Sequence, residues 1–148
     1  MSFSLKAPGA FTENDKAILA AADAMVGKAR DTMNGYALHQ VLNAVWAVVG
    51  EANRYFAGEA PWALAKTDPV RQGTVLYVTA EVLRQVAILA QPFMPESAAK
   101  LLDLLAIHPK ARDFSTLGAG QRIPFAAHLP APAPVFPRYV EPAGDKPS

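Results

Sequence analysis

Apolar side chains recur at intervals of three and four residues along four stretches of the chain. This spacing places them on one face of an α-helix, and that face must be buried against a neighbour. The connections between the stretches are short, which favours antiparallel neighbours. The pattern therefore predicts an all-α antiparallel helix bundle and contains no convincing strand. The apolar stretches cover residues 18–33, 38–56, 75–89 and 98–105.

Residues that favour helix ends separate these stretches. Thr12 with Asp15 three positions on resembles a capping box, in which each side chain accepts a hydrogen bond from the backbone N–H of the other residue. Asp68 followed by Pro69 suits a helix start, because aspartate is a good N-cap and proline is tolerated in the first turn. The remaining predicted ends carry glycine or proline and fall at Asn34-Gly35, at Gly58 with Pro61, and at Pro92 with Pro95.

The composition indicates one packed domain. Of the 148 residues, 51% are hydrophobic and 18% are charged, which suffices for a core and argues against disorder. The chain has no cysteine, which excludes disulfides and a thiol nucleophile and fits a cytoplasmic location. We expect no membrane partner, because no apolar run reaches spanning length and residues 1–10 lack a signal-peptide pattern.

Residue patterns typical of catalysis are absent. His39, His108 and His128 are scattered, without the spacing of metal ligands. No glycine loop for phosphates and no nucleophile motif occurs. We therefore expect no catalytic site, metal or cofactor in this chain. The net charge of +1 argues against indiscriminate nucleic-acid binding, so DNA is not an expected partner and RNA recognition would rely on stacking and shape.

A tryptophan follows one of the predicted helix ends. Trp62 comes directly after Pro61, outside the second predicted helix. Without neighbouring turns to cover it, the indole either fills a groove between two helices or stays partly open. An open, rigid indole is a face on which an unstacked base can lie, whereas most tryptophans are largely buried. The residue pattern leaves both interpretations open.

Three short motifs in order point to a family. Asn53-Arg54-Tyr55, then Ala-Pro-Trp within residues 60–66, then Pro-Phe-Met-Pro at residues 92–95 resemble the helical anticodon-binding domain of methionyl-tRNA synthetases, which are class I aminoacyl-tRNA synthetases. The resemblance covers residues 11–105 and reappears faintly at residues 135–138. The related synthetases for isoleucine, valine and leucine share the helical layout, but their later Pro-His and Glu-x-x-Trp segment is not found here.

The resemblance implies a function for the longer protein. That function is tRNA anticodon recognition as the C-terminal part of an ATP-dependent methionine–tRNA ligase, whose catalytic domain lies upstream in the same polypeptide. ATP with magnesium and methionine would serve the parent enzyme, and the RNA partner would be methionine tRNA. The helical domain would occupy residues 1–128 and lack its first helix, and residues 129–148 would form an extended Pro-rich tail.

The resemblance also assigns candidate site residues. Trp62 would stack on an anticodon base, most plausibly the first, and Pro61 would hold the ring in place. The amide of Asn53 would bond a base edge or, equally, cap a neighbouring turn. Some family members carry an acidic residue at the position of Ala57, so that polar contact is lost here. The candidate contacts to stem phosphates are Arg54, Lys66 and Arg71.

Two other functions compete with this interpretation. A helical protein–protein interaction module would use the exposed aromatic as an interface anchor. The equivalent domain of another class I synthetase would read a different anticodon. A tRNA-binding assay separates the first alternative, and tRNAs that differ only in the anticodon separate the second.

Overall fold

The computed structural model describes residues 3–4, 8–34, 38–117, 122–123 and 128–129. These residues form five α-helices, two short 3-10 helices and one pair of strands, and the prediction of an all-α bundle is confirmed. Of the predicted Pro-rich tail, residues 130–148 lie outside the described residues. The helices are α1 (Glu13–Asn34), α2 (Leu38–Glu59), α3 (Pro61–Thr67), α4 (Pro69–Ala90), α5 (Pro95–Leu104), η1 (Pro109–Ala111) and η2 (Phe114–Thr116).

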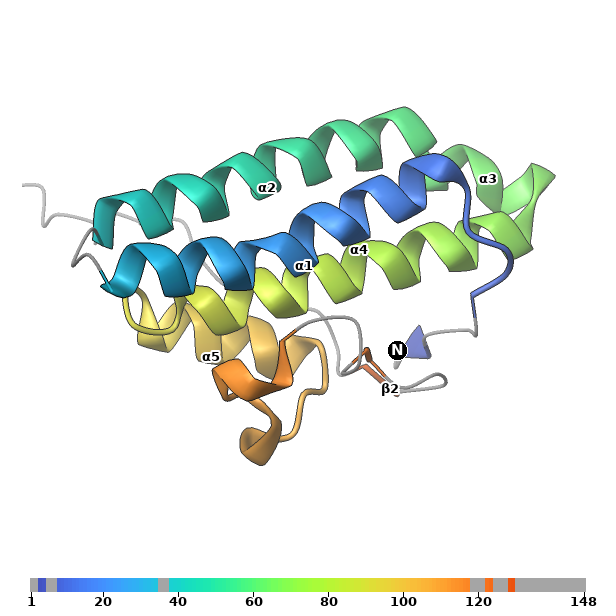
Figure 1. Ribbon diagram of the computed structural model, residues 1–148. Helices are drawn as coiled ribbons and strands as arrows, with labels where there is room; N and C mark the ends of the chain where they lie inside the picture. Colours follow the sequence, from blue (N-terminus) through green and yellow to red (C-terminus); the bar gives the residue numbers. More distant parts are fainter. Residues whose placement is uncertain (1–2, 5–7, 35–37, 118–121, 124–127, 130–148) are drawn as a thin grey trace, which may run out of the picture.

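Three long helices form the body of the bundle. Helices α1, α2 and α4 pack against one another in all three pairings, and consecutive long helices run in opposite directions (Figure 1). Both α3 and α5 pack against α4. Four helices were predicted; α3, with only seven residues, was missed because it is too short to show an apolar period.

A pair of strands was also missed. Strand β1 (Phe3–Ser4) pairs antiparallel with β2 (His128–Leu129), so that Phe3 faces Leu129 across the ladder. Each strand has two residues, too few to show alternation in the sequence. The pairing joins segments from opposite ends of the chain.

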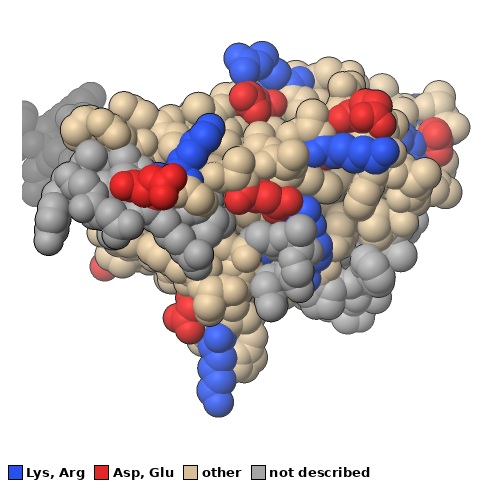
Figure 2. Space-filling model, viewed as in Figure 1, with Lys and Arg blue, Asp and Glu red and all other residues tan. Residues whose placement is uncertain are grey.

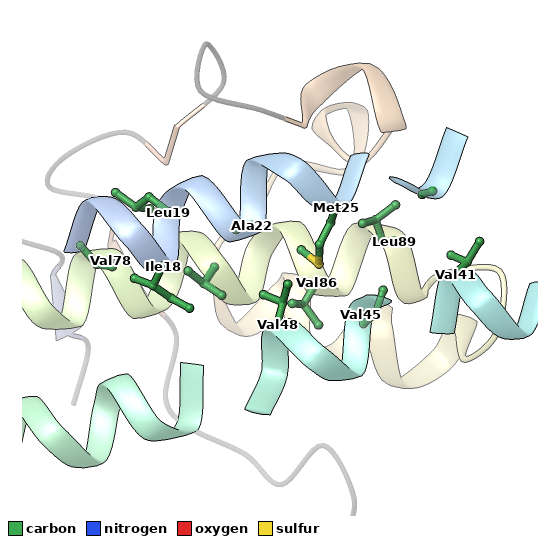
Figure 3. Close-up of a cluster of buried hydrophobic side chains, with 12 residues drawn as sticks. Ile18, Leu19, Ala22, Met25, Val41, Val45, Val48, Val78, Val86 and Leu89 are labelled. Atoms are coloured by element: carbon green, nitrogen blue, oxygen red, sulfur yellow. The ribbon is translucent and has the colours of Figure 1, made fainter. Parts of the chain in front are cut away.

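The core contains the predicted apolar faces. Figure 3 shows one cluster, in which side chains from α1, α2 and α4 meet. A second cluster joins α4 to α5 through Ile88 and Leu102, both fully buried. Within the predicted apolar stretches, the side chains of Val26, Met33 and Leu38 lie outside the described residues. The labelled members of the first cluster are Ile18, Leu19, Ala22, Met25, Val41, Val45, Val48, Val78, Val86 and Leu89.

Helix α4 is the central helix of the bundle. It is long and apolar enough to cross a membrane by length and composition, with a mean hydropathy of 1.3, although 83% of that window is buried inside the protein. The sequence-based prediction overlooked this. Burial on most sides explains the hydropathy, because a helix surrounded by neighbours needs few polar positions.

The predicted helix starts of α1 and α4 are confirmed. The backbone N–H of Thr12 donates to Asp15 Oδ2 at 3.0 Å, and that of Asp15 donates to Thr12 Oγ1 at 3.3 Å. The N–H of Arg71 donates to Asp68 Oδ1 at 3.1 Å. These bonds satisfy amides that have no partner within a helix.

Candidate functional site

The junction between α2 and α3 carries the aromatic residue singled out in the sequence. Helix α2 continues through Gly58 to Glu59, and Pro61 begins α3 as its first residue. Between them, Ala60 has φ 46° and ψ 63°, the left-handed conformation that turns the chain. Trp62 therefore lies outside α2, as predicted, and belongs to the short helix α3, which was not predicted. Proline starts a helix well because its missing N–H would have no partner in the first turn.

Trp62 is open to solvent. Its exposed fraction is 64%, whereas Pro61 beside it is buried. The Phe56 ring of α2 lies against the indole, with ring centroids 5.8 Å apart and planes tilted by 57°. Tilted contacts of this kind favour a fixed relative orientation. A tryptophan this exposed is not a core plug, so the junction presents an indole that is supported on one side and open on another.

Asn53 lies on α2 one turn before Phe56. Residues three apart on a helix are neighbours, so Asn53 lies on the flank of α2 that carries the Phe56–Trp62 contact. The side chain is exposed. Among the described residues it has no hydrogen-bond partner, and the alternative that it caps a neighbouring turn therefore has no support in the geometry.

Two of the predicted phosphate-contacting cations are exposed. Arg54 is on α2 and Lys66 is in the last turn of α3. Within the part of the chain that the structure describes, neither makes an ion pair. Arg54 lies on a different flank of α2 from Asn53, next to α1.

Arg71 has a different environment. Its side chain is 16% exposed and binds Asp15, whose side chain is fully buried. Nη2 donates to Asp15 Oδ1 at 2.7 Å and lies 3.0 Å from Glu59 Oε2. A phosphate contact stays a prediction for Arg71, but the geometry does not favour it. The local sequence hides this, because Asp15 is 56 positions away and a buried carboxylate requires a partner.

Tyr55 completes this polar cluster. Its hydroxyl donates to Asp15 Oδ1 at 2.5 Å. Burial opposes ionisation of Asp15, yet the hydrogen bonds from Arg71 and Tyr55 outweigh burial and lower the pKa of Asp15. Burial and the bond to Asp15 raise the pKa of Tyr55 far above its ordinary value. Tyr55 therefore stays a neutral donor to an ionised carboxylate, which fixes the start of α1 to the end of α2.

A cleft opens beside this cluster, and we call it the α1–α2 cleft. It has a volume of about 390 Å³. Gly58 lies in its wall, and a Cβ atom added there would meet open space. The sequence reasoning did not identify this cleft, because its two walls are far apart in the chain. Its lining residues are Asn14, Ala17, Ile18, Glu51, Arg54, Tyr55, Gly58 and Glu59.

Charge and metal-ligand chemistry are sparse. On the face shown in Figure 2, basic and acidic side chains are interspersed and form no continuous basic patch outside the grey atoms. Among the residues that the structure describes, no three His, Cys, Asp or Glu side chains are placed to hold a metal ion. The distinctive feature of this end of the bundle is thus an exposed aromatic beside a mixed polar cleft, which suits binding.

A family model decides the identity of the domain. The model described as the anticodon binding domain of methionyl tRNA ligase matches residues 5–141. The chain belongs to this family. The resemblance drawn from the three motifs is therefore confirmed for this anticodon-binding domain.

Relatives and solved structures agree. The domain is 60% identical over 134 residues to the methionine–tRNA ligase of Rhizobium meliloti (strain 1021), covering 90% of this chain and 26% of that protein. It is 45% identical over 139 residues to the enzyme of Mycobacterium tuberculosis H37Rv. A crystal structure of free M. tuberculosis methionyl-tRNA synthetase superposes with a TM-score of 0.88 at 43% identity, over 94% of this chain and 28% of that one. The chain thus spans about a quarter of the length of these relatives.

Proposed function

We propose that this anticodon-binding domain recognises the anticodon loop of methionine tRNA as the C-terminal part of a methionine–tRNA ligase. The observation that carries the proposal is the indole of Trp62, exposed by 64% yet supported by Phe56 at 5.8 Å. Sequence-specific recognition of RNA mostly targets unpaired loop bases that can be splayed out and stacked on aromatic side chains. The loop base would lie on the open face of the indole.

The residues around Trp62 would orient the loop base and contact the RNA phosphates. Buried Pro61 would hold the first turn of α3 and, with it, the position of the indole. Asn53, exposed and without a partner among the described residues, would offer an amide to the edge of a base. Arg54 and Lys66 would approach phosphates on either side of the loop. Arg71 is left out, because its guanidinium already binds Asp15 and Glu59.

The chemistry of ligation would belong to the longer polypeptide. A solved M. tuberculosis methionyl-tRNA synthetase is bound by methionyl-adenylate, which supports ATP and methionine as substrates of the parent enzyme, with magnesium as the companion of ATP. An upstream catalytic domain would carry that site, and the enzyme would act in the cytoplasm. This chain would contribute tRNA selection.

Equilibrium binding tests the proposal. The chain is titrated with the anticodon stem-loop of methionine tRNA and with a stem-loop whose three anticodon bases are exchanged. Preference for the methionine anticodon supports the proposal. Binding of neither RNA points to a protein-interaction module, whereas preference for the exchanged anticodon points to the domain of another class I synthetase.

A further inference from the structure

The α1–α2 cleft lies on a different flank of α2 from the one that Phe56 presents to Trp62. Tyr55 and Gly58 line the cleft, and Phe56 lies between them in sequence but points toward the indole. Glu59 lines the cleft two residues before Pro61. The cleft and the exposed indole are therefore separate surfaces that meet at the α2–α3 junction.

The walls of the cleft are rigid and partly apolar. Ala17 and Ile18 contribute from α1, and the Tyr55 ring contributes from α2. The Tyr55 hydroxyl is held by Asp15 at 2.5 Å, and Asp15 is held by Arg71. This wall requires little ordering when a ligand binds, which lowers the entropic cost of association.

The rim carries side chains that are available to a ligand. Glu51 and Arg54 are three residues apart on α2 and both exposed, yet neither makes an ion pair within the described part of the chain. Asn14 in the first turn of α1 is also exposed. Glu59 differs, because it is paired with Arg71 at 3.0 Å. The Glu51 carboxylate, the Arg54 guanidinium and the Asn14 amide thus lie around the apolar part of the cleft.

These groups match an unstacked nucleotide. A base is flat and apolar on its faces, and its edge carries the polar groups. The Glu51 carboxylate accepts hydrogen bonds only, so it suits a base with an exocyclic amino group, which donates two. The Arg54 guanidinium suits the attached phosphate. The volume of about 390 Å³ lies within the roughly 300–1,000 Å³ typical of pockets that bind small organic groups.

We infer that the α1–α2 cleft binds a second unstacked nucleotide of the same RNA loop, one whose base carries an exocyclic amino group. The inference rests on the proposed function, because both sites take bases from one anticodon loop. Trp62 stacks on one base without reading its edge. The cleft adds selection, since Glu51 accepts from the amino group of the second base while Arg54 binds its phosphate.

Filling the cleft tests this inference. Gly58 lines the cleft and a Cβ atom there meets open space, so Gly58→Leu should place a side chain in the cleft. Gly27→Leu on α1 is the matched control, because Gly27 is equally open and does not line the cleft. We expect Gly58→Leu to weaken binding of the anticodon stem-loop of methionine tRNA at least about fivefold, the lower end of the loss of one base contact. Gly27→Leu leaves the affinity unchanged.

A second variant tests the selection and does not depend on the packing of Gly58. For the unaltered chain, the loop nucleotides are replaced with uridine one at a time. Apart from the base on Trp62, we expect one position at which the replacement weakens binding. Glu51→Gln should abolish that position's preference for an amino-bearing base, and an unchanged thermal unfolding curve confirms that the fold is kept. Persistence of the same preference in Glu51→Gln overturns the inference.

The outcome for Trp62→Ala separates the two proposals. Loss of affinity in Trp62→Ala with full affinity in Gly58→Leu retains anticodon binding and removes the cleft from it. Full affinity in both variants removes both the indole and the cleft from the RNA-binding surface, whereas absence of stem-loop binding by the unaltered chain removes the proposed function itself. Loss in both, with Gly27→Leu unaffected, supports the cleft as part of the RNA-binding surface.

Discussion

The guanidinium of Arg71 binds both carboxylate oxygens of Asp15 and joins the first turn of α4 to the first turn of α1. The pair extends to Glu59 at the end of α2, so one arginine connects all three long helices beside the candidate site. The sequence suggested Arg71 as a contact to RNA. In the structure its side chain holds Asp15, which in turn binds the Tyr55 hydroxyl in the wall of the α1–α2 cleft.

Arg71→Ala should destabilise the fold strongly. Breaking a buried ion pair by removing one partner typically costs about 3–5 kcal/mol, because the remaining charge is left uncompensated. Urea unfolding of the variant measures the free energy of unfolding. The control is Arg54→Ala, an exposed arginine on α2, for which we expect a change within about 0.5 kcal/mol. Near-normal stability of Arg71→Ala combined with a loss of RNA affinity would show that Arg71 contacts a phosphate and does not stabilise the fold.

Acid should weaken the same cluster. The pKa of Asp15 is lowered in the folded chain, so its contribution to stability is complete above the ordinary aspartate value of 3.8. That contribution is lost as the pH falls from there through the folded-state pKa. We expect the free energy of unfolding to decline below about pH 4. Asp15→Asn should flatten the decline, with a residual slope from Asp23, whose pKa is lowered by its partner Arg122 against the effect of burial. An identical acid slope in Asp15→Asn would contradict the role given to Asp15.

RNA binding should depend only shallowly on salt. The net charge is +1, and among the described residues the proposed phosphate contacts are two exposed cations, Arg54 and Lys66. Each phosphate neutralised contributes about −0.7 to −0.9 to the slope of log affinity against log salt. Titrations of the stem-loop at several potassium chloride concentrations should therefore give a slope no steeper than about −3. A slope near −5 or beyond would reveal a basic surface that the described residues do not show.

The sequence predicted the long-range architecture better than the local details of the site. The apolar period predicted the cores of α1, α2, α4 and α5, because α1, α2 and α5 each bury one continuous face and α4 is buried on most sides. The period could not reveal α3, whose seven residues span two turns. Pro61 looked like a stop signal, although proline is compatible with both the end of one helix and the start of the next.

The site itself depends on contacts between distant residues. The exposure of Trp62 follows from the left-handed turn at Ala60, a conformation uncommon for alanine. The pairing of Arg71 with Asp15 and the walls of the α1–α2 cleft join α1 to segments more than 30 residues later. Local residue patterns carry no signal for contacts between distant segments. The sequence therefore suggested Arg71 as an RNA contact and did not predict the cleft.

Affinity for the anticodon stem-loop in Trp62→Ala is the most direct test of the central claim. If a loop base stacks on the indole, truncation should weaken binding by about 1–3 kcal/mol, while the free energy of unfolding changes little because the side chain is 64% exposed. Trp46→Ala is the matched control, since Trp46 is 55% exposed on α2 and lies outside the α2–α3 junction. Isothermal titration of both variants and the unaltered chain gives the affinities. Selective loss in Trp62→Ala is the predicted result, and equal RNA affinity in Trp62→Ala and the unaltered chain would contradict it.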